Sequence, residues 1–230
     1  MPRRALSIVP LLLLCLLFTA CSNGQGRLVS LGKTDIDLVT DIHQRQAEEL
    51  LRTLAGKLYR RNPRELHKCS SADLDQRLAQ LFNAERNLSF AELDNRQGVA
   101  AILLALEPDY PRDRVFALMV GLISMVRSAY GNQPEFFMFD QLEPQLLYNS
   151  ARNIEILVWR LKVRVDDGGT PLLLTNSREG EEPNLSFERL FGKLISLQDS
   201  MALIAAQKWD RTINLVVRGT ASMVFLPVGL

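Results

Sequence analysis

The chain has 230 residues, of which 47% are apolar, and its 27 basic side chains nearly balance its 26 acidic ones. A near-neutral chain of this kind indicates no basic surface, which argues against nucleic-acid binding and against electrostatic docking on anionic lipid. Its length is sufficient to bury a substantial core, as one domain or as two closely packed subdomains.

The start of the chain has the pattern of a secretion signal. Residues 1–4 carry two positive charges, residues 5–18 are almost entirely apolar, and the small residues Thr19 and Ala20 precede Cys21. A basic start, a short apolar run and small residues at the cleavage point are typical of a signal peptide, and the run is too short for a comfortable membrane-spanning helix. We therefore expect residues 1–20 to be removed.

Residues 17–21 (LFTAC) resemble the lipobox that the bacterial lipoprotein signal peptidase recognises. Phe18 stands where that pattern prefers leucine, and Cys15 is rejected as an alternative because the bulky Leu14 precedes it. The chain as a whole also resembles uncharacterised proteobacterial outer-membrane lipoproteins. The resemblance implies that Cys21 becomes the first residue and carries a thioether diacylglycerol and a third, amide-linked acyl chain.

These acyl chains would attach the protein to a membrane. Each buried methylene contributes about 0.8 kcal/mol, and two acyl chains already give stable anchoring. In this class an aspartate after the cysteine favours retention in the inner membrane, and Ser22 stands at that position here. The resemblance thus implies the periplasmic face of the outer membrane, while an uncleaved apolar anchor and an ordinary secreted protein remain the alternatives.

Residues 21–34 contain Gly and Ser without hydrophobic periodicity. We expect them to form a lipidated tether with a root-mean-square reach of roughly 20 Å, followed by a helical domain over residues 35–230. Gly32-Lys33-Thr34 is not a phosphate-binding loop, because Arg27 occupies the position of the required first glycine. With Cys21 acylated, Cys69 alone remains in the mature sequence, so no internal disulfide is expected, and its thiol is either a small buried group or a bridge to a partner.

Apolar residues at helical spacing predict a long helix over residues 35–61. Pro63 ends it, because the residue before a proline avoids helical angles. A short helix to about Cys69 is expected next. A capping box at residues 70–73 then predicts a third helix over residues 71–83.

A second capping box, formed by Ser89 and Glu92, predicts a helix that ends near Glu107. Its residues 99–106 are apolar on every side, which indicates a central, fully packed segment. The helix is therefore expected to lie inside the bundle.

The next helix is expected to begin with Pro111 at its first position and to end at residues 130–132 (YGN). Its apolar run, residues 115–126, is too short to span a bilayer, so we expect a buried helix of a soluble domain. Small residues along one side would let a partner helix approach closely: Ala117, Gly121, Ser124 and Ser128.

Asp140 and Glu143 are expected to cap a long helix that continues to about Val165. Asn149 and Asn153 lie beside its apolar seam. Such residues are usually solvated or hydrogen-bonded to neighbouring backbone.

Residues 166–184 form the longest irregular region, in which residues 172–174 are expected to pair briefly as a strand or to fill part of the core. Ser186 is expected to cap a last helix that continues to Val217. The apolar tail, residues 219–230, is expected to pack back onto the bundle, with contact to lipid as the alternative. The sequence therefore predicts an all-α, multi-helix bundle with a short irregular region near 166–184.

The sequence predicts no catalytic residue, metal site or cofactor. His67 and Cys69 are two residues apart and would point away from each other on a helix, and His43 is expected at the surface among charges. The motifs HExxH and GxSxG and paired-cysteine spacings do not occur. Carboxylates are numerous, but nothing selects two of them as a glycosidase pair.

Residues 135–139 (EFFMF) form the densest aromatic cluster of the chain. We expect Phe136, Phe137 and Phe139 to bind a partner, because aromatic residues in a connection can anchor an interface; packing under the following helix is the alternative. The expected function is non-enzymatic: an interaction or assembly factor at the outer membrane, with an unidentified envelope protein as partner. A carrier of lipid or another amphiphile, and a cell-wall hydrolase, are the alternatives.

Overall fold

The computed structural model describes residues 32–68, 73–83, 86–175, 177, 180–214 and 224–228. The expected signal peptide, most of the tether and Cys69 lie outside the described residues. The described part contains seven α-helices, and its only β-pairing is an isolated bridge between Val165 and Pro171. The predicted all-α bundle is confirmed.

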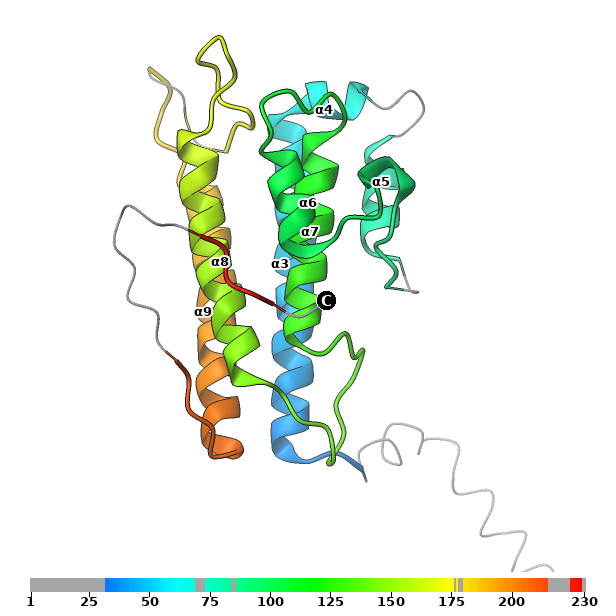
Figure 1. The fold of residues 1–230 in the computed structure, drawn as a ribbon, viewed down its shortest axis with the longest axis vertical. Coiled ribbons are helices and arrows are strands. Elements are labelled where there is room, and N and C mark those ends of the chain that lie inside the picture. Colours follow the sequence, from blue (N-terminus) through cyan, green and yellow to red (C-terminus); the bar gives the residue numbers. More distant parts are fainter. Residues whose placement is uncertain are drawn as a thin grey trace, which may run out of the picture.

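The long helices run up and down side by side, and the shorter helices lie along one flank and at one end of the bundle (Figure 1). The α-helices, in chain order, are α3 (Asp35–Arg61), α4 (Pro63–His67), α5 (Leu74–Leu81), α6 (Gly98–Ala105), α7 (Arg114–Ala129), α8 (Pro144–Val163) and α9 (Ser186–Lys208). At the end that we call proximal, α3 begins, α9 ends and the connection from α7 to α8 turns; α4 closes the distal end (Figure 1).

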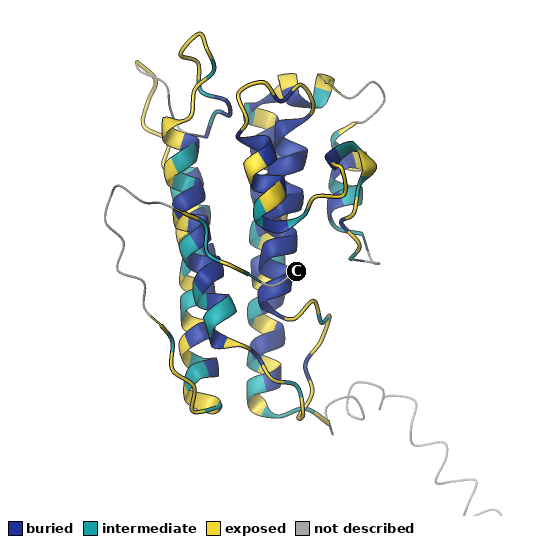
Figure 2. Ribbon diagram, in the orientation of Figure 1, coloured by how far each residue is buried: buried dark blue, intermediate teal, exposed yellow. Residues whose placement is uncertain are grey.

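The helix α7 is the centre of the bundle, and all sixteen of its residues are buried. Figure 2 shows this continuous burial against the mixed exposure of α8 and α9. The close approach predicted along its small residues is confirmed: α6 packs so near that a Cβ atom on Gly121 would lie 2.6 Å from the carbonyl oxygen of Gly98. The amide of Gly98 also donates to the hydroxyl of Ser124, at 2.7 Å. The helix begins later than Pro111, because Asp113 caps it by accepting from the amide of Phe116 at 2.9 Å.

The single helix expected from Ser89 to Glu107 is wrong. A short 3₁₀ helix, η3 (Ala91–Leu93), is followed by a turn in which Asp94 and Asn95 have φ of 51° and 57°, and α6 starts only at Gly98. These left-handed angles interrupt an α-helix. Glu92 does not close a capping box, since its carboxylate binds Arg77 on α5 at 2.7 Å.

The last helix is shorter than expected. It ends at Lys208, with Trp209 as its C-cap, and Asp210 then turns the chain with φ of 49°. The remaining expected helix falls partly on residues 215–217, which lie outside the described residues. Ser186 is the first helical residue and Leu185 is the N-cap.

Residues 224–228 lie across α8 and so bring part of the tail back to the bundle, as expected (Figure 1). Asn153 holds them in both directions: its side-chain amide donates to the carbonyl of Leu226 at 2.8 Å, and its carbonyl accepts from the amide of Leu226 at 2.7 Å. Asn149 donates to the carbonyl of Pro227 at 2.8 Å. Of the two alternatives expected for these asparagines, solvation or bonds to backbone, the structure shows bonds to backbone, and the backbone is that of the distant tail.

Candidate functional site

The connection between α7 and α8 carries the aromatic residues that were expected to bind a partner. Phe136 is 2% exposed and packs edge-on against Tyr130, with ring centroids 6.4 Å apart. It belongs to the core, so we withdraw it from the expected surface. The next three side chains are open to solvent: Phe137 is 42%, Met138 54% and Phe139 89% exposed. We call Phe137, Met138 and Phe139 the aromatic loop.

Buried polar groups at the start of α3 hold this connection in place. Asp41 is 4% exposed, accepts from the amide of Phe136 at 2.9 Å, and uses its other oxygen to bind the ammonium of Lys33. Gln44 donates to the carbonyl of Gln133 at 2.7 Å. The buried face of α3 therefore fixes the backbone on which the aromatic loop is mounted.

The loop itself is a closed turn that touches the first described residues. Asp140, expected to cap α8, instead accepts from the amide of Phe137 at 2.8 Å, and its own amide returns a 2.8 Å bond to the carbonyl of Phe137. The amide of Met138 donates to the carbonyl of Gly32 at 3.0 Å, and Lys33 lies 4.9 Å from the ring centre of Phe137. The aromatic loop thus lies at the point where the chain from Cys21 enters the bundle.

Lys33 is engaged by its own chain. Burial by itself would lower the pKa of its ammonium, but hydrogen bonds and charge interactions with Asp41 and Glu135 outweigh that effect and raise the pKa. Its distance to the carboxylate of Glu135 is 3.2 Å. The cation is therefore neutralised locally.

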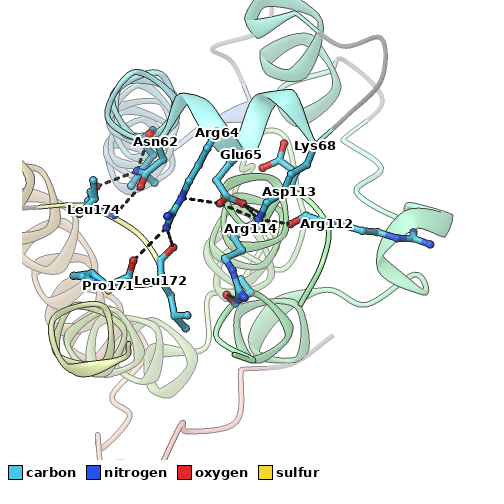
Figure 3. A network of polar contacts seen from close by, with 12 residues as sticks. Asn62, Arg64, Glu65, Lys68, Arg112, Asp113, Arg114, Pro171, Leu172 and Leu174 are labelled. Atoms are coloured by element: carbon cyan, nitrogen blue, oxygen red, sulfur yellow. Dashed lines mark hydrogen bonds and ion pairs between the residues drawn. The ribbon is translucent and has the colours of Figure 1, made fainter. Parts of the chain in front are cut away.

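A second polar cluster lies at the distal end, where it joins α4 to the start of α7 and to the loop after α8 (Figure 3). Glu65 is fully buried, accepts from the amide of Arg114 at 2.9 Å, and binds the ammonium of Lys68 at 2.8 Å. Asn62 and Arg64 bind the loop after α8 through the main chain of Leu174, Pro171 and Leu172.

Asp113 is the second buried carboxylate of this end, and it is 2% exposed. Burial raises its pKa to about 6, although the amide of Phe116, the hydroxyl of Tyr59 and the charge of Arg77 act in the opposite direction. Tyr59 donates to it at 2.9 Å. Glu65 and Asp113 are thus enclosed, and each accepts from a first-turn amide of α7 that has no partner within the helix. The helix dipole favours negative charge at this N-terminus.

A groove of about 540 Å³ lies between α3 and α9, open to solvent. Its walls mix apolar and polar side chains: Gln46, Glu49, Leu50, Thr53, Lys193, Ser196 and Leu197. An amphiphile-binding site is usually more enclosed and more apolar than this.

Of the two histidines, His43 is half-buried on α3 and His67 is exposed at the end of α4. Within the described ranges, no three His, Cys, Asp or Glu residues gather as metal ligands. In that same part of the chain, no helix combines the length and apolar character needed to cross a membrane. Comparisons with protein-family models, curated proteins and solved structures give no match.

Proposed function

We propose that this protein is a lipid-anchored helical body, held at the periplasmic face of the outer membrane by acyl chains on Cys21, that acts as a non-enzymatic interaction or assembly factor. The observation that supports this most directly is the position of the aromatic loop. Phe139 is 89% exposed, more than any other large apolar side chain that the structure describes, and the amide of Met138 donates to the carbonyl of Gly32, the first described residue on the side of Cys21. A protein anchored there would carry its apolar contact residues close to the membrane.

The buried carboxylates give a hydrolase little support. A glycosidase needs two carboxyl groups that flank a substrate. Glu65 and Asp113 are 0% and 2% exposed, and both are hydrogen-bonded to backbone amides of α7. Their geometry explains how the distal end is held together rather than how a glycan would be bound.

The carrier alternative also receives little support. Helices that are apolar on every side could enclose a ligand cavity. Here α6 and its neighbours pack directly onto α7, and the groove between α3 and α9 includes Glu49 and Lys193 in its walls. Interaction through exposed side chains therefore remains the function that we propose.

Mass spectrometry of the mature N-terminal peptide tests the anchor. We expect Cys21 to carry a diacylglycerol thioether and an acylated α-amine. The variant Cys21→Ser should lose the modification and leave the membrane fraction, whereas the matched control Cys69→Ser should keep both. An unmodified Cys21 in the mature chain, or a mature terminus at another residue, would refute the anchoring.

Photo-crosslinking in intact cells tests the interaction. A photoreactive residue in place of Phe139 should give adducts with a defined envelope component. The control position is Leu185, an apolar residue that is 58% exposed at the distal end. Equal, nonspecific adducts from the two positions would contradict an interaction through the aromatic loop.

A further inference from the structure

We propose that the component touched by the aromatic loop is the lipid bilayer itself, and that this contact orients the bundle with its proximal end against the membrane. The inference rests on the proposed anchoring at Cys21, and it names what the exposed residues bind. In this proposal the aromatic loop binds a phospholipid surface, and not an unidentified protein.

The side chains of the loop suit an interface between water and hydrocarbon. Three consecutive large apolar residues are exposed, and Phe139 at 89% is the most exposed of them. The exposed loop lies beside the start of α3 in Figure 2. At the same end, Trp209 is half-buried and Lys208 reaches the hydroxyl of Thr34 at 3.5 Å. Tryptophan and long cationic side chains are both common at the level of lipid headgroups.

The length of the chain between the anchor and the loop restricts what the loop can reach. The stretch from Cys21 to Gly32 spans at most about 40 Å when fully extended and roughly 20 Å as a flexible chain. By comparison, α9 alone is about 34 Å long at 1.5 Å per residue. An acylated Cys21 would therefore keep the proximal end near the bilayer, and the aromatic loop is bonded to the residue where that stretch ends.

The loop is also prepared for contact before it binds. Asp140 accepts from the amide of Phe137 at 2.8 Å, and Asp41 accepts from the amide of Phe136, the residue just before the loop, at 2.9 Å. Because the backbone is held in this way, little conformational entropy remains to be lost on insertion. Lys33 is already neutralised by Asp41 and Glu135. The contribution of the loop itself is thus apolar, and it should depend little on salt or on anionic lipid.

The small size of the apolar surface favours lipid over a protein partner. A specific protein interface buries about 1,000 Å² or more in total, whereas a single aromatic side chain buries about 150–250 Å². The two exposed rings of the loop would supply only a small part of such an area. They are sufficient to add to the hold of acyl chains, because one fully buried Phe contributes about 1.5–3 kcal/mol.

The test measures lipid contact directly in the acylated, mature chain. Phe139→Cys is placed in a Cys69→Ser background, labelled with a polarity-sensitive fluorophore, and reconstituted into phosphatidylcholine vesicles that contain nitroxide-labelled lipid. Leu185→Cys in the same background is the matched distal control. We expect a blue shift and quenching by the lipid nitroxide at position 139, and neither at position 185.

A second variant measures how much the loop contributes. In the Cys21→Ser chain, which has no acyl anchor, the double change Phe137→Ser and Phe139→Ser should weaken binding to the same vesicles by at least about tenfold. Added salt should leave the ratio of the two affinities nearly unchanged. Because both rings are exposed, these substitutions should leave the fold intact, which circular dichroism can verify.

Two results would overturn the inference. In the first, position 139 stays as exposed to water as position 185 in the vesicles. In the second, position 139 is shielded in native envelope membranes but not in pure lipid, which would assign the loop to a protein. The mass of the N-terminal peptide, measured on the same preparation, reports the anchor separately, so failure of the proposed function can be distinguished from failure of the lipid contact.

Discussion

The contact between α6 and α7 gives the sharpest prediction, the substitution Gly121→Ala. A Cβ atom at this position would lie 2.6 Å from the carbonyl oxygen of Gly98 and 2.7 Å from the amide nitrogen of Ile102. Both atoms belong to the backbone, so no side-chain rotation can move them away. The two helices would have to separate to admit the methyl group.

Two opposing effects set the magnitude of this change. Replacing glycine by alanine inside a helix favours folding by about 1 kcal/mol. Inserting a methyl group into a packed core usually costs about 1–3 kcal/mol, and more where the surroundings cannot yield. Since the contacted atoms of Gly98 and Ile102 are fixed, we expect Gly121→Ala to lower the free energy of unfolding by about 2 kcal/mol.

Urea unfolding, followed by circular dichroism in a Cys21→Ser background, measures this loss. The matched control is Gly192→Ala on α9, where an added Cβ meets nothing within 4 Å. That variant should be more stable than the parent by about 0.5–1 kcal/mol, through helix propensity alone. If Gly121→Ala were as stable as Gly192→Ala, the close packing of α6 on α7 would be wrong.

Three further predictions concern buried polar groups. The pKa of Asp113 is raised from 3.8 to about 6, so the folded state binds the proton more tightly than the unfolded state, and the stability from this group is present at low pH and lost as pH rises from about 4 to 6. Asp113→Asn should remove about 2–3 kcal/mol from this pH dependence of the free energy of unfolding, measured by urea unfolding. An unchanged dependence would contradict the raised pKa. Ser124→Ala should lower the free energy of unfolding by about 1–3 kcal/mol, because it leaves the Gly98 amide without its acceptor. A neutral effect would show that another acceptor replaces the hydroxyl of Ser124. Asn153→Ala should abolish the hydrogen-exchange protection of the Leu226 amide, while the protection of the Gly98 amide persists. Retained protection at Leu226 would show that the hydrogen bonds of Asn153 are not what holds the tail.

The long helices were predictable because one periodic pattern covers each of them. The expected bounds of residues 35–61 match α3, and α8 ends within two residues of its expected end. The close contact at Gly121 was also foreseeable, since small residues at helical spacing leave room only for another backbone.

The break before α6 was not predictable from local pattern. Ser89 and Glu92 have the spacing of a capping box, but Glu92 binds Arg77 from α5 instead. An ion pair between segments brought together only by folding overrides a local cap. The left-handed turn at Asp94 and Asn95 then interrupts the helix.

The candidate site was only partly predictable. The sequence points to residues 135–139, but not to which rings are buried, because that depends on the turn closed by Asp140. The supporting residues carry a signal that sequence reasoning missed. Asp41 and Gln44 are polar residues on the buried face of α3, in helical register with Ala47 and Leu51. Polar side chains placed on a core-facing stripe usually have a specific partner to satisfy.

The docking of the tail has a consequence for how its sequence can vary. The side-chain amides of Asn149 and Asn153 are hydrogen-bonded to the main chain at residues 226 and 227. These bonds recognise peptide groups and no particular side chain. Substitutions at position 226 should therefore be tolerated, provided that the new residue keeps a peptide N–H, which proline lacks. Asn153 has no comparable freedom, because it both donates to and accepts from the main chain of Leu226. Among the other side chains only glutamine carries the same planar amide, and its extra methylene would displace the two bonds.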